Sequence, residues 1–350
     1  MIELFTTQPL EALKQVLSRL EPSSVFALTD ENVFAKVIRT NPELHDFLLP
    51  RLYVMPAGEE AKTLEQTAKV WDWLSANGAT RKSVLVNIGG GVVTDLGGFA
   101  AATYMRGIPH INVPTSLLGA VDAAFGGKTG IDFGGLKNLV GAFRQPAAII
   151  VCADFFATLP REELLSGYGE MLKHALLDGP DLLRDTLEAA DDIRLGKVDP
   201  DLLRRNIAVK NRIVSQDPEE GGLRRVLNLG HTVGHAIEEW RLSEQRPVPH
   251  GYAVAWGLTA ELALSVVYHG LESGILRAVG KTVSRLYGSP GLTCDDYPAL
   301  LALMQRDKKN PTAADISFAP LPAPGTPALH AVHTPAEIST AIDLARDLLD

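Results

Sequence analysis

The pattern of apolar and polar positions predicts strands that alternate with helices over the first 160 residues. Apolar residues recur at helical spacing from Leu10 to Leu20 and again from Leu64 to Leu74. The strand-like segments that separate these patterns begin near residues 25, 52, 84, 108 and 148. Short buried runs that alternate with helices are typical of a parallel sheet covered by helices. We therefore expect an α/β fold in this part of the chain.

After residue 160 the helical pattern dominates and strand-like runs nearly vanish. The long helical patterns span residues 161–177, 200–214, 227–240 and 254–268. Pro160 suits the first turn of a new helix, so we place a domain boundary near residue 158. The expected domains are residues 1–158, of α/β type, and residues 159–350, mainly α-helical.

The C-terminal segment contains an irregular stretch and a clear helix start. Residues 316–332 are rich in proline and contain short apolar pieces, which predicts a hairpin-like excursion. Thr334, Pro335 and Glu337 match the N-cap, N1 and N3 positions of a capping box, which predicts a closing helix through Leu349.

Composition and charge restrict the class of protein. The 350 residues are 46% hydrophobic and 21% charged, as in ordinary soluble enzymes. A net charge of −9, without long runs of Lys or Arg, argues against binding to nucleic acid or to a membrane surface. No signal peptide or long uncharged apolar run is evident, so we expect a cytoplasmic location. Two cysteines cannot make a disulfide framework, and Cys152 is expected to be buried.

Three consecutive glycines follow the strand-like run that begins at Val84. Gly89, Gly90 and Gly91 either let a ligand approach the backbone closely or form a tight turn without a ligand, and the pattern leaves both open. Their spacing is not the GxGxxG fingerprint of dinucleotide-binding folds. Ligands bind beyond the carboxyl ends of parallel strands, which makes candidates of the loops at 58–62, 89–95 and 114–116.

Histidines in the second domain suggest a metal site. His231 and His235 lie four residues apart on a predicted helix and share one face, as a metal site or a proton-transfer pair requires. The glutamate of the HExxH motif is absent, which disfavours a zinc peptidase. Glu170 and His250 add a carboxylate and a third imidazole, and one glutamate with two of the histidines and an open position would make a catalytic zinc set. Scattered histidines are more often surface or core residues, so spacing alone leaves both interpretations open.

Cations beside glycine or asparagine form a second candidate site. They are Lys128, Lys137, Arg224, Lys308 and Lys309. Exposed lysines usually serve solubility, whereas several cations that converge would bind phosphate or carboxylate. The pattern does not decide between these two interpretations.

Taken together and in order, these motifs resemble the 3-dehydroquinate synthases of the sugar phosphate cyclase superfamily. The resemblance extends from about residue 50 to about residue 310, and the agreement of many motifs makes it more specific than any one of them. The matching segments are 58–62, 89–95, 104–107, 113–116, 121–130, 137–138, 170–173, 220–224, 228–231, His235, 250–251 and 307–310.

The resemblance implies a Rossmann-like NAD domain, a mainly helical metal-binding domain and an active site in the cleft between them. It also implies a homodimer that binds NAD and one divalent metal ion, Zn or Co. Glu170, His231 and His250 would hold the metal ion. The NAD contacts that it implies are Glu59, Lys62, Gly89, Gly90, Gly91, Val92, Asp95, Thr115, Ser116, Lys128, Lys137 and Thr158.

The resemblance also implies a substrate site. Its catalytic residues are His235, as a proton-transfer group, with Lys128, Asp122, Lys173 and Glu220. Its substrate contacts are Arg106 from a neighbouring subunit, Lys128, Asn138, Lys210, Arg224, Asn228, and Lys308 or Lys309. Of these, Lys210 and Arg224 match the family's carboxylate site, and the others match its phosphate site.

The implied activity is that of a carbon–oxygen lyase of the shikimate pathway, which serves aromatic amino acid biosynthesis. The substrate, 3-deoxy-D-arabino-heptulosonate 7-phosphate, would give 3-dehydroquinate and phosphate. Bound NAD would oxidise the C5 hydroxyl before phosphate leaves, and the ketone would then be reduced again, so that NAD is regenerated.

Three other functions remain as alternatives. Another sugar phosphate cyclase, of the inosose or valiolone synthase type, would act on a substrate without a carboxylate and would not need Lys210 and Arg224. A metal-dependent polyol dehydrogenase would release NADH, and a catalytically silent NAD-binding regulator would more readily have lost the metal set. Thr94 and Tyr252 stand where the family usually has glycine and an acidic residue, which puts local details of the site in doubt.

Overall fold

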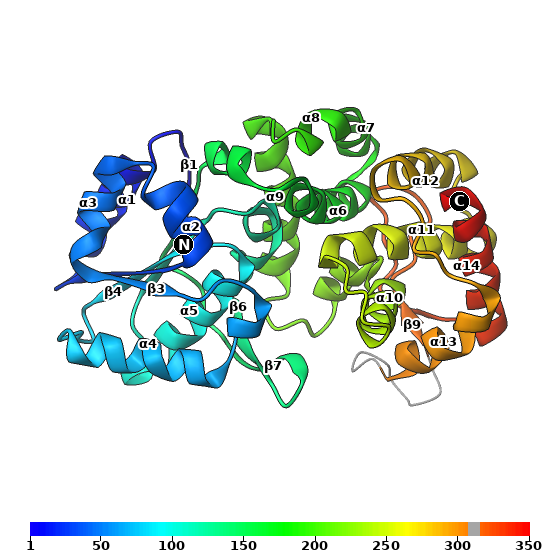
Figure 1. Cartoon of the computed structure of the whole chain (residues 1–350). Coiled ribbons are helices and arrows are strands. Elements are labelled where there is room, and N and C mark those ends of the chain that lie inside the picture. Colours follow the sequence, from blue (N-terminus) through cyan, green and yellow to red (C-terminus); the bar gives the residue numbers. More distant parts are fainter. Residues whose placement is uncertain (307–315) are drawn as a thin grey trace. The chain divides into compact units, whose positions relative to one another are not determined.

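The computed structural model describes residues 1–306 and 316–350 of the chain. It divides into two compact units. Unit 1 comprises Met1–Pro160 and Gly196–Pro200, and unit 2 comprises Arg161–Leu195 and Asp201–Asp350. Figure 1 shows the helices and strands of both units, coloured along the chain.

Unit 1, whose residues are all described, is built on a six-stranded parallel sheet. Its strands are β1 (Ile2–Phe5), β2 (Val25–Asp30), β3 (Leu52–Met55), β4 (Val84–Gly89), β5 (His110–Pro114) and β8 (Ala148–Val151). Their order is β1-β8-β5-β4-β2-β3, and neighbouring strands are parallel throughout. The predicted α/β fold is therefore confirmed. The strands β4, β5 and β8 are buried along their whole length, which explains their apolar sequences.

Helices connect the strands of this sheet. They are α1 (Pro9–Leu20), α2 (Glu31–Val33), α3 (Pro42–Leu48), α4 (Leu64–Ala76) and α5 (Gly91–Thr103). Short π or 3-10 turns are η1 (Phe34–Ile38), η2 (Leu49–Arg51), η3 (Glu59–Ala61), η4 (Tyr104–Arg106), η5 (Gly119–Ala123) and η6 (Ala153–Thr158). The predicted helices near 10–20 and 64–74 are confirmed, and Cys152 is buried as expected. The chain reverses direction across the sheet between β2 and β4, so α5 begins at the kind of switch point where such sheets bind ligands.

A β-hairpin that the sequence pattern did not predict extends from unit 1 (Figure 1). Strands β6 (Lys128–Phe133) and β7 (Leu136–Phe143) pair antiparallel, with an irregular register between Ile131 and Phe133. Most of β7 is exposed, although it carries large apolar side chains. A strand exposed on both faces has no apolar–polar alternation, which is why the pattern missed it.

Unit 2 is mainly helical, as predicted. Its helices are α6 (Arg161–Asp178), α7 (Pro180–Glu188), α8 (Ala190–Arg194), α9 (Pro200–Gln216), α10 (His231–Ser243), α11 (His250–His269), α12 (Ser273–Tyr287), α13 (Tyr297–Gln305) and α14 (Pro335–Leu349), with 3-10 turns η7 (Leu223–Asn228) and η8 (Cys294–Asp296). The helices predicted at 227–240 and 254–268 have the wrong starts. Gly230, with a φ of 80°, separates η7 from α10, and Pro249 directly precedes α11.

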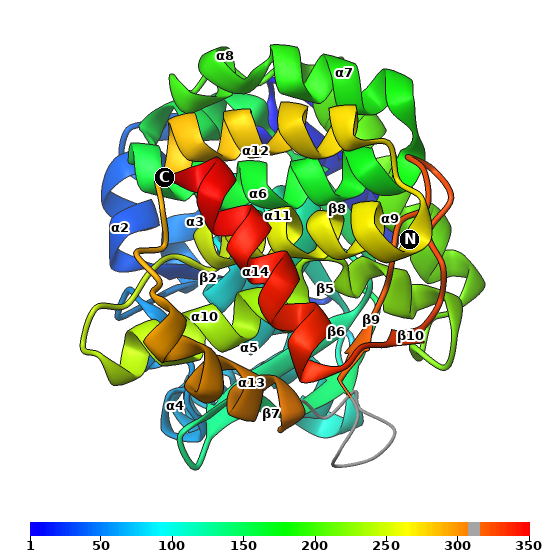
Figure 2. The same cartoon turned by 90° about the vertical axis from the view of Figure 1, so that its right-hand side faces the viewer.

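The C-terminal segment agrees with its predicted form. Strands β9 (Ser317–Phe318) and β10 (Ala331–Val332) pair antiparallel and form the expected hairpin-like excursion. The hydroxyl of Thr334 accepts the Glu337 N–H at 3.3 Å, and the Glu337 carboxylate accepts the Thr334 N–H at 2.8 Å, which confirms the capping box. Helix α14 then packs across α11 and α12 (Figure 2).

Helix α11 lies in the core of unit 2. By length and composition alone it could cross a membrane, but 78% of the window concerned is buried. Helices α6, α10, α12 and α14 pack against it. Burial by these neighbours accounts for its nearly continuous apolar sequence.

Acid is expected to destabilise the protein through one histidine of the sheet. His110 in β5 is fully buried, and burial, followed by the nearby Arg144, lowers its pKa to about 4. In the unfolded chain this histidine takes up a proton near pH 6.5, whereas in the folded chain it stays neutral down to about pH 4. The free energy of unfolding therefore falls as the pH drops through 6.5. From pH 7 to pH 5 this amounts to roughly 2 kcal/mol. Denaturant unfolding should show this loss in wild type and in the control His330→Leu but not in His110→Leu, and equal losses in all three would contradict the assignment.

Candidate functional site

Two histidines from two helices of unit 2 lie close to one carboxylate oxygen of a glutamate on a third helix. Glu170 Oε1 in α6 lies 3.3 Å from His231 Nε2 in α10 and 3.4 Å from His250 Nε2 in α11. Glu170 is fully buried, whereas the side chains of His231 and His250 are 11% and 30% exposed. The structure therefore brings the three predicted metal ligands together, and His250 is the most exposed of them.

The spacing of these donors fits a tetrahedral metal ion. Zinc binds imidazole nitrogen and carboxylate oxygen at roughly 2.0–2.1 Å, so two ligands of a tetrahedral site lie about 3.3–3.4 Å apart. The two measured separations, 3.3 and 3.4 Å, fall in this range.

The hydrogen bonds of the two rings also fit a metal site. His231 Nδ1 lies 3.2 Å from the Leu229 carbonyl, and His250 Nδ1 lies 2.9 Å from Glu238 Oε2. Carbonyl and carboxylate oxygens accept hydrogen bonds, so each Nδ1 carries a proton. In a neutral ring the Nε2 lone pair then faces the Glu170 carboxylate, and a proton or a metal ion between the two atoms would stabilise this arrangement.

Glycines at two helix crossings bring these ligands within reach of one another. A Cβ on Gly251 would overlap the Ser166 carbonyl of α6, and a Cβ on Gly169 would overlap the Gly251 carbonyl. A Cβ on Gly257 would overlap the Gly230 carbonyl at the start of α10. Helix α11 therefore approaches α6 and α10 backbone to backbone, which larger residues at these positions would prevent.

Burial and charge together set the protonation of the cluster. Burial alone would raise the pKa of Glu170, but Lys173, His231 and His250 outweigh it and hold that pKa well below its ordinary value. Burial, aided by Lys173, lowers the pKa of His231. Burial would also lower the pKa of His250, but hydrogen bonds to Glu170 and Glu238 raise it to about 10. The metal-free cluster thus contains an ionised Glu170, a neutral His231 and a protonated His250.

His235, the predicted proton-transfer residue, lies beside the same cluster. Its ring centroid is 5.2 Å from that of His231 and 5.7 Å from that of His250. Ligand atoms of these three histidines all lie within 4.8 Å of one another. The geometry therefore allows two ligand sets, which share His231 and His250 and differ in whether Glu170 or His235 is the third member. Lys173, also predicted to be catalytic, forms an ion pair with Glu170 Oε2.

The predicted NAD loop lies at the carboxyl end of β4 in unit 1. Gly90 is the N-cap of α5, so Gly91 and Val92 lie in the first helical turn, whose backbone N–H groups lack intrahelical partners. Such N–H groups bind the phosphates of nucleotides. The adjoining β5 loop supplies Thr115 and Ser116, and a Cβ on Gly90 would lie 3.2 Å from Ser116 Oγ.

The three glycines serve different purposes. A Cβ on Gly89 would overlap the Val93 side chain, so this glycine is required by packing alone. Gly90 and Gly91 are partly exposed, and Gly91 has room for a Cβ at 3.4 Å from Ala123. Packing thus explains Gly89, and the approach of a ligand to the backbone of Gly90 and Gly91 stays a prediction.

A buried lysine connects the segment before α4 with helix α5 and strand β7 of unit 1. Lys62 Nζ donates to Asp95 Oδ2 at 2.7 Å and to Asn138 Oδ1 at 2.6 Å, and Glu59 Oε1 lies 3.7 Å away. Burial alone would lower the pKa of Lys62, but Asp95 and Glu59 outweigh it and raise that pKa. The predicted NAD residues Glu59, Lys62 and Asp95 thus lie together, and Asn138, predicted to contact phosphate, lies with them.

Arg106, the residue predicted to reach a neighbouring subunit, lies exposed in an unusual backbone turn. Met105 and Arg106 have φ values of 50° and 67°, and Gly107 follows at 113°. Positive φ is uncommon for residues with a side chain, and it concentrates at functional positions. The other predicted residues of unit 1 are Asp122, which is half-buried, and Lys128, Lys137 and Thr158, which are exposed.

Two buried cations of unit 2 match the predicted carboxylate site. Lys210 in α9 and Arg224 in η7 are 6% and 2% exposed. The Asp217 carboxylate accepts the backbone N–H groups of Gly222 at 2.7 Å and Arg224 at 2.9 Å, which fixes the loop that carries Arg224. The Arg224 guanidinium also donates to the Pro218 carbonyl, and its charge interacts with the Asp217 carboxylate, so this side chain is held in place by its own loop.

The remaining predicted substrate residues divide into two groups. Glu220 Oε1 accepts the Asn228 amide at 3.1 Å, so these two predicted residues contact each other. Lys308 and Lys309 lie outside the described residues.

The two departures from the family pattern are accommodated locally. Thr94 is buried in α5, and its hydroxyl donates to the Gly91 carbonyl at 3.0 Å. The Tyr252 ring makes edge contacts with Trp256 and Tyr287, with centroids 6.0 and 4.9 Å away. Neither residue disturbs the positions of the predicted ligands.

Sequence reasoning missed two carboxylates that contact the starts of α10 and α11. Glu238 accepts a hydrogen bond from His250, and Glu261 accepts backbone N–H groups around His231. A signal for Glu261 was available, because it is an isolated acid within the apolar helical pattern at 254–268, where a charge must be paired.

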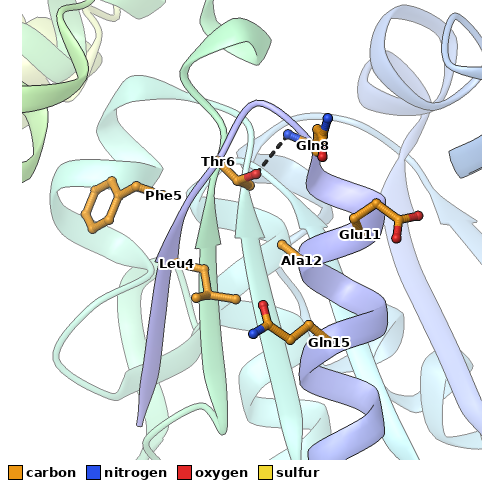
Figure 3. A pocket seen from close by; sticks show the side chains of 7 residues that line it. All are labelled: Leu4, Phe5, Thr6, Gln8, Glu11, Ala12 and Gln15. Atoms are coloured by element: carbon orange, nitrogen blue, oxygen red, sulfur yellow. Dashed lines mark hydrogen bonds between the residues drawn. The ribbon is translucent and has the colours of Figure 1, made fainter.

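A separate hollow of about 260 Å³ lies beside β1 and α1 of unit 1 (Figure 3). The residues around it are Leu4, Phe5, Thr6, Gln8, Glu11, Ala12 and Gln15. It contains none of the predicted site residues, and the Thr6 hydroxyl within it already accepts the Gln8 N–H at 2.8 Å. We assign it no part in the candidate site.

Comparison with known proteins gives consistent sequence matches. Residues 52–166 match the family described as 3-dehydroquinate synthase N-terminal, and residues 167–310 match the family described as 3-dehydroquinate synthase C-terminal. A curated 3-dehydroquinate synthase of Parabacteroides distasonis is 40% identical over 335 residues, covering 96% of this chain and 95% of the relative. That of Pyrococcus furiosus is 41% identical over 306 residues, covering 86% and 87%.

Solved structures give the same fold at lower identity. A 2-epi-5-epi-valiolone synthase of Streptomyces hygroscopicus, solved with NAD+ and Zn2+, has a TM-score of 0.83 at 24% identity and covers 99% of this chain and 96% of its own. A 2-deoxy-scyllo-inosose synthase, solved with carbaglucose-6-phosphate, NAD+ and Co2+, has a TM-score of 0.81 at 24% identity, covering 97% and 95%.

Proposed function

The chain belongs to the 3-dehydroquinate synthase family, and from that membership we propose that it converts 3-deoxy-D-arabino-heptulosonate 7-phosphate to 3-dehydroquinate and phosphate. The observation that carries the proposal is the cluster of Glu170, His231 and His250, whose spacing suits a catalytic divalent ion. We assign NAD binding to unit 1, and metal and carboxylate binding to unit 2. We place this reaction in the cytoplasm.

The proposed cofactors are NAD and one divalent metal ion. When bound, NAD would supply a reversible hydride acceptor, and the metal ion would supply a Lewis acid for the hydroxyl that is oxidised. The N-terminus of α5, with Ser116 beside it, would hold the NAD phosphates. Glu170, His231 and His250 would hold the metal ion, which leaves His235 as a nearby imidazole.

His235 would then move protons between its ring and the substrate hydroxyl. It lies within 6 Å of both histidine ligands by ring centroid and is partly exposed, so it is near the metal position and reachable. Lys173 would keep the Glu170 carboxylate ionised through their ion pair. Neither of these two roles changes the oxidation state of NAD over one turnover.

The nearest alternative is another sugar phosphate cyclase, as in the inosose and valiolone synthases of the same fold. Substrates of that kind lack a carboxylate, whereas the family resemblance assigns Lys210 and Arg224 to a carboxylate site. Both cations are present in this chain and buried in unit 2, which favours the acid substrate.

Phosphate release from a panel of sugar phosphates tests the proposed function. The metal-loaded chain with NAD is expected to release phosphate from the heptulosonate phosphate, without net NADH, and not from glucose 6-phosphate or sedoheptulose 7-phosphate. Release from a neutral sugar phosphate alone would select the alternative cyclase, and accumulation of NADH would select a polyol dehydrogenase.

We propose further that the chain is a homodimer that pairs through the β6–β7 hairpin of unit 1. The hairpin exposes Phe133, Leu136, Leu139 and Phe143 at 51%, 52%, 42% and 60%. Strand β6 is mostly buried against α5, so the exposed apolar side chains lie on β7 and at the turn. Exposed apolar side chains that gather on one segment mark interaction surfaces, and a second copy would cover them.

Phe143→Glu is expected to convert this dimer to a monomer, because it places a charge among the apolar side chains of the hairpin. Light scattering after gel filtration measures the mass. Leu329→Glu is the matched control, since Leu329 is 52% exposed in unit 2 and should leave the mass unchanged. A dimeric Phe143→Glu would place the interface elsewhere.

A further inference from the structure

The proposed ligands His231 and His250 are the first residues of α10 and α11, and each helix carries a carboxylate that contacts the start of the other. On the side of α10, Glu238 Oε2 accepts a hydrogen bond from His250 Nδ1 at 2.9 Å. This bond places the proton on Nδ1, so that Nε2 is the atom turned toward Glu170. Glu238 therefore fixes both the tautomer and the rotation of the His250 ring.

On the side of α11, Glu261 acts on the backbone around His231. Its carboxylate accepts the N–H groups of Gly230 at 2.8 Å, Thr232 at 3.0 Å and Val233 at 3.3 Å. These groups belong to the start of α10, where backbone donors have no partner within the helix. Glu261 is 2% exposed, and charge-assisted bonds of this kind hold a backbone firmly.

We propose that Glu238 and Glu261 are positioning residues, which hold His250 and His231 so that both Nε2 atoms face Glu170 and a divalent metal ion. The proposal rests on the proposed function, since it assumes that this cluster binds the metal. Each carboxylate acts through a ligand and does not contact the metal itself. Because each helix both supplies a ligand and fixes the other ligand, the two orientations depend on each other.

If Glu238 only held α10 and α11 together, its removal would lower the stability of the fold. The glycine crossing at Gly230 and Gly257 already brings α10 and α11 together, and Glu238 is 16% exposed at its side chain, so water could solvate it without His250. Removing Glu238 should therefore leave the helix pair folded and change the ring orientation. The sensitive measurement is metal affinity rather than thermal stability.

The test titrates Co2+ into the metal-stripped, full-length protein against a competing chelator. Loss of a hydrogen-bond partner behind a ligand typically weakens metal binding about 10- to 100-fold, and we expect this for Glu238→Ala. Glu238→Gln should recover most of the affinity, because its amide oxygen can still accept the His250 proton. Glu239→Ala is the matched control, since Glu239 is the exposed next residue on α10.

For Glu261 the conservative variant is used, because alanine would leave three buried N–H groups unsatisfied. Glu261→Gln keeps the volume and one acceptor but loses the charge, so we expect weaker Co2+ binding by about tenfold and an altered Co2+ absorption spectrum. Circular dichroism and the unfolding temperature of the metal-free variants establish that the fold is retained.

The outcomes separate this proposal from the proposed function. Wild-type affinity and an unchanged Co2+ spectrum in both Glu238→Ala and Glu261→Gln would overturn the positioning roles and leave the proposed function standing. Absence of Co2+ binding in wild type would overturn the metal site itself, and the positioning roles with it.

Discussion

Replacing His250 with alanine is expected to remove the metal ion and abolish phosphate release. In the structure His250 Nε2 is one of three donors that surround the same position, 3.4 Å from Glu170 Oε1. Apparent binding energies of about 10–16 kcal/mol over four zinc ligands suggest roughly 3 kcal/mol per ligand, or at least a hundredfold in affinity. Metal analysis after dialysis should find none bound, and phosphate release should fall below detection.

The metal content and rate of His250→Ala are to be compared with those of His235→Ala. If His235 moves protons and does not bind the metal, its alanine variant keeps the metal and loses about 10²- to 10⁴-fold in rate. Both ligand sets allowed by the geometry contain His250, so His250→Ala alone does not separate them. If His235→Ala lost the metal ion and Glu170→Gln kept it, the third ligand would be His235 and not Glu170. His330→Ala, at an exposed histidine, controls for the loss of any histidine.

The parallel sheet could be predicted from sequence because buried parallel strands consist of apolar runs. The strand at 148–151, which is buried at every position, begins where it was predicted to begin. The edge strand β1 and the hairpin β6–β7 could not be predicted in this way, since exposed strands have no buried face to impose a pattern. The closing helix was predictable for another reason, since the contacts of a capping box are local in sequence.

The residues of the candidate metal site could be predicted from local motifs, but their meeting in space could not. The family motifs identified Glu170, His231 and His250, but spacing in the sequence could not show that three helices meet there. That depends on close crossings at Gly251 and Gly257, which are visible only in three dimensions. The helix-start errors at 227 and 254 have a local cause, because Gly230 and Pro249 outweigh the apolar periodicity. With the corrected starts, both histidines lie at the first position of a helix.

The second large effect is expected at Arg224, the buried cation that we propose binds the substrate carboxylate and so distinguishes an acid substrate from a neutral one. Its loop is fixed by Asp217, and its guanidinium donates to the Pro218 carbonyl, so the side chain is held in place before substrate binds. Truncating one partner of a buried charge pair costs about 2–5 kcal/mol, so Arg224→Met should lower kcat/KM for the heptulosonate phosphate by roughly 30- to 5,000-fold.

Three further measurements make the Arg224 result decisive. Arg224→Lys keeps the charge but not the two-pronged geometry and should recover part of the activity. Arg225→Met, at the exposed next residue, should resemble wild type. Metal and NAD content should be unchanged in Arg224→Met, because the lost contact is with the substrate carboxylate. If Arg224→Met retained full kcat/KM on the acid phosphate, the carboxylate role would be wrong, and Arg224 would serve only the loop that contains Asp217 and Pro218.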